Sequence, residues 1–143
     1  MTLAAVFEFH ENPANLALLL KGRESFRLLR HDGSIVPGSM TWVQETIGGM
    51  IPVTMGFRHS MIEPPHRFRE EMVHGPFRYF EHTHEFVAST AGTEVIDTLE
   101  LSLPWYYGGD HATGRLVGPV IREMFEERHA ALGQVFGVHF NVG

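Results

Sequence analysis

The sequence predicts an α+β fold: a curved antiparallel sheet of about six strands around a long C-terminal helix, with two short helices near the N-terminus. Apolar residues recur at helical spacing at both ends of the chain and alternate with a period of two between them. Short connections rich in Gly and Pro separate the alternating segments, which favours an antiparallel meander. With 143 residues, we expect a single domain over residues 1–143.

The first predicted elements are two short helices within Ala4–Gly22. Asn12-Pro13 interrupts the segment, because Asn12 can cap a helix and Pro13 suits a first helical position. We therefore expect the two helices to meet near Glu11 and the second to end at Gly22.

The middle of the chain alternates between apolar and polar residues, as expected of half-buried strands. Turn signals such as Asp32-Gly33, Gly48-Gly49 and Gly75-Pro76 separate the strands. The predicted strands are Phe26–His31, Ser39–Ile47, Pro52–Glu63, Arg67–His74, Phe77–Ala88 and Thr93–Leu103.

The last third of the chain predicts one amphipathic helix over Ala112–Phe136. An open sheet with one apolar face must cover that face, and this helix is the only predicted element long enough to do so. We expect a space between the sheet and the helix in which a ligand binds.

The composition excludes several classes of protein. Eleven basic residues against 17 acidic ones give a net charge of −6, and Lys21 is the single lysine, so a general nucleic-acid-binding surface is excluded. No apolar run approaches the roughly 20 residues that span a bilayer, so membrane insertion is not expected. The chain has no cysteine and no basic segment that leads into an apolar one at its start, which together indicate a cytoplasmic protein.

Strand alternation predicts which side chains face the ligand. On Phe77–Ala88, one face carries Phe80, His82, His84 and Phe86, has no formal charge, and is therefore expected to point inward. The same test on the other strands, together with the helix stripe and the loop before it, predicts a ligand-binding set: Trp42, Gln44, Met55, Phe57, His59, Phe80, His82, His84, Phe86, Asp97, Leu99, Leu101, Trp105, Val117, Val120, Ile121 and Met124.

A few members of this set are polar on an otherwise apolar face. Asp97 is expected opposite His84 across the Ser89–Gly92 turn, within reach of a hydrogen bond. Such residues either orient the polar end of a ligand or satisfy one another inside the core. The polar members are Gln44, His59, His82, His84 and Asp97.

Catalysis and metal binding are alternative interpretations of the same residues. His82 or Asp97 could act as an acid–base group, although no nucleophile elbow, phosphate-binding glycine loop or dinucleotide motif is present. A His-x-His pair with a nearby acid can also supply zinc ligands. Since the sequence shows no carboxylate placed to orient both histidines, we predict no metal and no cofactor.

The loop Trp105-Tyr106-Tyr107 has two interpretations. It is either a lid that closes on a ligand through a Gly108-Gly109 hinge, or a staple that holds the loop onto the helix.

Several segments resemble the SRPBCC, or START-like, superfamily, and most closely its small bacterial members of the polyketide cyclase/dehydrase-like or ligand-binding kind. They are Phe7–Leu16, Gly75–Phe77, Phe80–Phe86, Gly92-Thr93 with Asp97, Leu103-Pro104, and Phe125 with Arg128. The resemblance implies a helix-grip fold with a hydrophobic ligand cavity. Its members bind lipids, sterols, polyketides or plant hormones, and some act as cyclases or aromatases. Fold alone does not choose among these activities.

The chain departs from this family at its start, where Met1–Leu3 is too short for the family's first strand. The usual neighbour of that strand, Thr93–Leu103, is then expected to be an exposed edge that could pair with a second chain in a homodimer.

We therefore expect the protein to bind or transport a small hydrophobic ligand such as a lipid, a polyketide or an aromatic molecule. The alternatives are a polyketide cyclase or aromatase that uses His82 or Asp97, and an interaction module without a ligand that acts through its sheet edge.

Overall fold

The computed structural model describes residues 2–15, 26–47, 50–131 and 138–142. Its helices are α1 (Leu3–Glu11), α3 (Gly109–Ala112) and α4 (Gly118–Ala131), with a 3₁₀ turn, η1 (Trp105–Tyr107), and a π turn, η2 (Thr113–Val117). Its strands are β1 (Phe26–His31), β2 (Met40–Ile47), β3 (Ile51–Glu63), β4 (Arg67–His74), β5 (Tyr79–Ser89), β6 (Gly92–Ser102) and β7 (Val138–Val142). No helix within these ranges is long and apolar enough to cross a bilayer.

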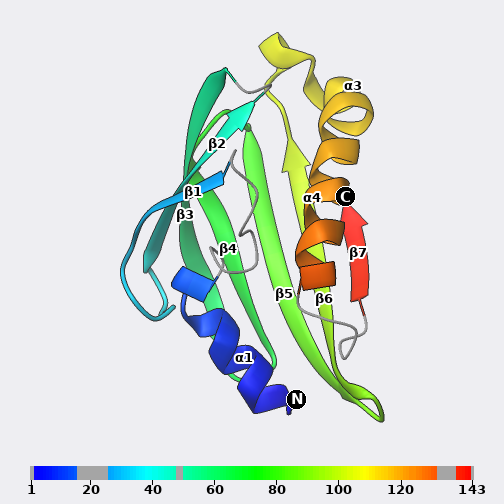
Figure 1. The fold of residues 1–143 in the computed structure, drawn as a ribbon. Helices are drawn as coiled ribbons and strands as arrows, with labels where there is room; N and C mark the ends of the chain where they lie inside the picture. Colours follow the sequence, from blue (N-terminus) through cyan, green and yellow to red (C-terminus); the bar gives the residue numbers. More distant parts are fainter. Residues whose placement is uncertain (1, 16–25, 48–49, 132–137, 143) are drawn as a thin grey trace.

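The predicted six-strand antiparallel sheet is confirmed. The strands follow one another in chain order, and each predicted boundary lies within two residues of the observed one. Figure 1 shows the sheet curving around α1 and α4. Side chains of both helices pack against residues of the sheet's concave face.

The seventh strand was not predicted. β7 runs parallel to β6 and pairs with it from Val95 to Leu99 (Figure 1). The prediction that this edge is exposed is therefore wrong, because β7 covers it. The predicted homodimer and the predicted interaction module both required a free edge at β6, so this argument for them no longer holds. Local residue spacing does not predict this pairing, because β6 and β7 are separated in the sequence by the C-terminal helix.

The N-terminal helix is confirmed. Thr2 caps α1 by accepting a hydrogen bond from the Ala5 amide, and the helix ends before Asn12. The Asn12 side chain accepts a hydrogen bond from the Ala14 amide, so Asn12 starts the next turn as expected. The rest of the second predicted helix, from residue 16 to Gly22, lies outside the described residues.

The C-terminal helix is less regular than predicted. It comprises α3, η2 and α4, and residues 132–136 of the predicted helix lie outside the described residues. Val117, Ile121, Met124 and Phe125 pack toward the sheet. Val120 is 56% exposed, because it lies beyond the edge of this stripe.

The concave face carries two apolar clusters. The α1 cluster consists of Val6, Phe7, Ile35, Phe68, Phe86 and Val95. The α4 cluster consists of Val43, Phe57, Phe80, Leu99, Leu101, Ile121 and Phe125.

Candidate functional site

A row of polar side chains crosses the sheet between the two apolar clusters. We call this row the polar belt; its members, from β2 to β6, are Thr41, His59, Glu70, His82, His84 and Asp97. On β5 the order of side chains shows the arrangement, because Phe80 belongs to the α4 cluster, Phe86 to the α1 cluster, and the two histidines lie between them.

Asp97 contacts both histidines of β5. Its Oδ1 lies 2.7 Å from His82 Nε2 and 2.8 Å from His84 Nδ1, and all three side chains are about 2% exposed. The register confirms the prediction that Asp97 lies opposite His84. The contact with His82 was not predicted.

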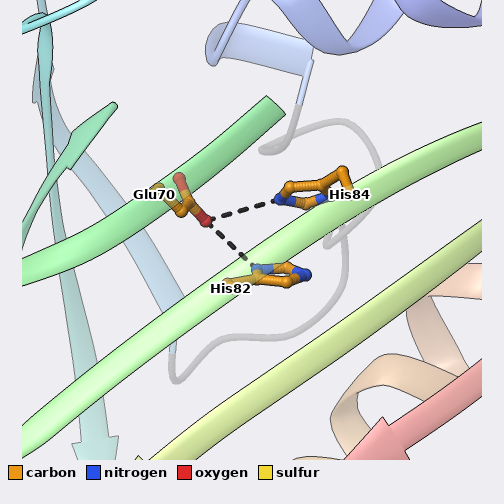
Figure 2. Close-up of side chains that lie close together, drawn as sticks. All are labelled: Glu70, His82 and His84. Carbon is orange, nitrogen blue, oxygen red and sulfur yellow. Dashed lines mark hydrogen bonds and ion pairs between the residues drawn. The ribbon is translucent and has the colours of Figure 1, made fainter. Parts of the chain in front are cut away.

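Glu70 faces the other side of the same histidines (Figure 2). Its Oε1 lies 3.2 Å from His82 Nδ1 and 3.6 Å from His84 Nε2. Its Oε2 lies 3.5 Å from His59 Nε2. Glu70 is absent from the predicted ligand-binding set, although its alternation with Phe68 and Met72 on β4 marks it as inward-facing.

The surrounding side chains fix the imidazole rings. His84 stacks on Phe68 with ring centroids 4.2 Å apart, and Phe125 meets His82 edge-on at 4.9 Å. His59 Nδ1 lies 3.1 Å from both the hydroxyl and the carbonyl oxygen of Ser39. The belt is thus held in one geometry by aromatic packing and by hydrogen bonds.

Mutual contacts shift the ionisation of the belt. Burial acts to raise the pKa of Glu70, but hydrogen bonds and charge from His82 and His84 outweigh it and hold this pKa well below its ordinary value. Burial acts to lower the pKa of His82, but hydrogen bonds to Asp97 and Glu70 outweigh it and raise this pKa. Burial, followed by the charge of His82, lowers the pKa of His84. His82 is therefore the more basic imidazole of this pair.

A cavity of about 50 Å³ borders the belt next to α1. The Thr41 hydroxyl is buried and has no hydrogen-bond partner among the described residues. The cavity has an apolar wall of Phe9, Pro13, Ile35 and Phe68, and a polar wall of His10, Asn12, Asn15, Thr41, His59, Glu70 and His84.

Most residues of the predicted ligand-binding set face the interior, but few border a cavity. His59 and His84 line the cavity beside α1, and Leu101 lines a second one of about 460 Å³ beside η2 and the start of α4. His82 and Asp97, the predicted acid–base candidates, are buried and absent from both linings. The remaining inward members pack within or against the two clusters: Met55, Phe57, Phe80, Phe86, Leu99, Val117, Ile121 and Met124.

The predicted orientation of β2 is wrong by one residue. Trp42 pairs with Gly56 and Gln44 with Thr54, on the convex face, while Val43 points inward. The Trp42 ring lies over Gly56, where an added Cβ would be 2.7 Å from a ring carbon. Because Gly56 has no side chain, the Trp42 ring can pack over it on the convex face of the sheet.

The aromatic loop points into solvent. Trp105 is 85% exposed, and Tyr106 packs against both its neighbours. Trp105 lines neither of the two cavities.

The sheet, the helices and the cavity define a helix-grip protein of the SRPBCC type. The chain belongs to the family described as polyketide cyclase / dehydrase and lipid transport, whose model matches residues 1–132. No curated protein sequence matches the chain.

Solved structures share the fold at low identity. Protein TTHA0849 from Thermus thermophilus has a TM-score of 0.65 and 22% identity, over 92% of this chain and 86% of that one. Protein Ms6760 from Mycobacterium smegmatis has a TM-score of 0.64 and 14% identity, over 92% and 81%. Protein CV1439 from Chromobacterium violaceum has a TM-score of 0.52 and 17% identity, over 66% and 67%.

Proposed function

We propose that the protein binds or transports a small, mainly apolar molecule, such as a lipid, a polyketide or an aromatic compound, by holding its polar end against the polar belt. The observation that carries this proposal is the cavity beside α1, in which buried polar groups face aromatic and aliphatic side chains. Membership of a ligand-binding family supports it. A cytoplasmic location is part of the proposal, since a chain without cysteine suits a reducing compartment.

The cavity limits how the ligand sits. A volume of about 50 Å³ has room for one small polar group or a few waters, and not for a whole lipid. The apolar body of the ligand therefore lies outside the cavity, against the residues around its mouth.

Thr41 is the residue that distinguishes a polar end from an apolar one. Its buried hydroxyl lacks a partner among the described residues, which costs about 1–3 kcal/mol, so a ligand that supplies a partner recovers that energy. We expect a ligand with a hydroxyl or carboxylate to bind more tightly than the same molecule without it.

The test uses NMR titration of the full chain with decanoic acid, and with 2-naphthol beside naphthalene. We expect the polar probes to shift the amide signals of Phe9, Ile35 and Thr41, and naphthalene to bind more weakly than 2-naphthol. Thr41→Val should weaken 2-naphthol binding by up to about tenfold, the equivalent of one hydrogen bond.

Thr98→Val is the matched control, because Thr98 pairs with Thr83 on the convex face of the sheet. It should leave the affinity unchanged. The proposal fails if no probe shifts these signals, or if both valine variants bind 2-naphthol as the wild type does.

A further inference from the structure

Beyond this proposed function, we propose that Glu70, His82 and His84 bind a divalent transition-metal ion of the Zn²⁺ or Fe²⁺ kind. Their ligand atoms lie within 4.8 Å of one another. Two imidazole nitrogens and one carboxylate oxygen are the donor set that both catalytic zinc sites and non-haem iron sites use.

The distances from the Glu70 carboxylate to the two imidazoles suit one ion. Zinc bonds to nitrogen and oxygen are about 2.0–2.2 Å long, so two ligand atoms of a tetrahedral site lie roughly 3.4 Å apart. Glu70 Oε1 lies 3.2 Å from His82 Nδ1 and 3.6 Å from His84 Nε2, close to that separation (Figure 2). The ion would replace the proton that His82 Nδ1 shares with Glu70.

Asp97 supplies the outer carboxylate that metal-binding histidines need. It lies 2.7 Å from His82 Nε2 and 2.8 Å from His84 Nδ1, the two ring nitrogens that face away from Glu70. Asp97 thus forms a hydrogen bond with His82 and an ion-pair contact with His84, and a carboxylate in this place can orient metal-binding imidazoles. Residue spacing alone places no carboxylate beside both histidines, but the register between β5 and β6 brings Asp97 there.

The cavity beside α1 supplies an open coordination position. Glu70 and His84 line it, together with His59, whose Nε2 lies 3.5 Å from Glu70 Oε2. A three-ligand site with space for a water or a small molecule is typical of a catalytic metal, whereas a structural metal is closed by four protein ligands. The glutamate and aspartate also give the site two carboxylates, which favour a cation.

Calorimetric titration of the chelator-treated full chain with Zn²⁺ tests the proposal. We expect one Zn²⁺ per chain. Asp97→Asn should weaken binding by about 10–100-fold, as expected for a residue that orients metal ligands. Glu70→Gln and His84→Gln should weaken it more, because each removes a ligand.

Glu71→Gln is the matched control. Glu71 follows Glu70 on β4, but its carboxylate lies 3.7 Å from Arg58 and is 39% exposed. This variant should bind Zn²⁺ as the wild type does. Circular dichroism of each variant establishes that a loss of binding is not a loss of fold.

Co²⁺ absorption of the wild type gives a second measurement that needs no variant. Coordination by two imidazoles and a carboxylate should produce visible bands more intense than those of hydrated Co²⁺. The proposal is overturned if the wild type binds no Zn²⁺, if its Co²⁺ spectrum is that of the hydrated ion, or if the folded Glu70→Gln and His84→Gln variants bind Zn²⁺ as tightly as the wild type.

Discussion

The polar belt and the α4 cluster lie side by side on the same sheet face, and most of their side chains are buried, but they are held together differently. Leu99 is fully buried in the α4 cluster, where it packs against other apolar side chains. Asp97, two residues earlier on β6, is equally buried and meets two imidazoles at hydrogen-bond distance. Apolar contacts are non-directional, whereas a buried carboxylate depends on particular atoms.

This difference makes the free energy of unfolding more sensitive to a substitution in the belt than to one in the cluster. A cluster that loses one methyl group keeps its other contacts, but a buried ion pair that loses one partner leaves an unpaired charge. A belt made only for stability would be replaceable by apolar residues of similar volume. Its place beside a cavity agrees with the proposed binding of a polar group there.

The largest loss of stability is expected in the belt. Asp97→Asn should lower the free energy of unfolding by about 3–5 kcal/mol, since it removes the carboxylate between two buried imidazoles. Urea unfolding followed by circular dichroism measures the change. A loss below about 1 kcal/mol, typical of an exposed pair, would show that the belt is not held as described.

A substitution in the α4 cluster should lower the free energy of unfolding somewhat less. Leu99→Ala should cost about 2–5 kcal/mol in the same urea experiment, from lost burial and from the cavity left behind. Val120→Ala on α4 is the control, because Val120 is exposed and should change stability by less than about 0.5 kcal/mol. Equal effects of the two substitutions would contradict the burial of Leu99 and the exposure of Val120.

A substitution on the convex face of the sheet should cause a smaller loss of stability again. Gly56→Ala should cost about 1–3 kcal/mol, because its Cβ would overlap the Trp42 ring. The double variant with Trp42→Leu should recover part of this loss, since the two residues are in direct contact. Thermal unfolding of the two single variants and the double variant measures the coupling. Strictly additive losses would mean that the ring and the glycine do not meet.

The sequence predicted the elements and the facing of β5 and β6 well, because Phe80, His82, His84 and Phe86 alternate with charged or polar residues without ambiguity. It failed on β2, where Trp42 and Val43 are both apolar and the choice between them depends on Gly56 of the neighbouring strand. β7 was missed for a related reason, because its pairing with β6 joins distant segments that local alternation does not connect. The inward facing of Glu70 follows from the alternation on β4, and only its contact with His82 needs the register between β4 and β5.

The smallest effect is expected for charges outside the belt. The side chains of Arg58 and Glu71 are exposed and form an ion pair in which Nη2 lies 3.7 Å from Oε2. Glu71→Gln should therefore change the free energy of unfolding by less than about 1 kcal/mol. Glu70→Gln, one residue earlier, should cost more, because Glu70 contacts His82, His84 and His59 and is only 19% exposed. Urea unfolding of the two variants compares neighbouring glutamates that differ chiefly in the face they occupy. Equal losses would show that burial beside the imidazoles adds nothing to the contribution of a carboxylate on β4.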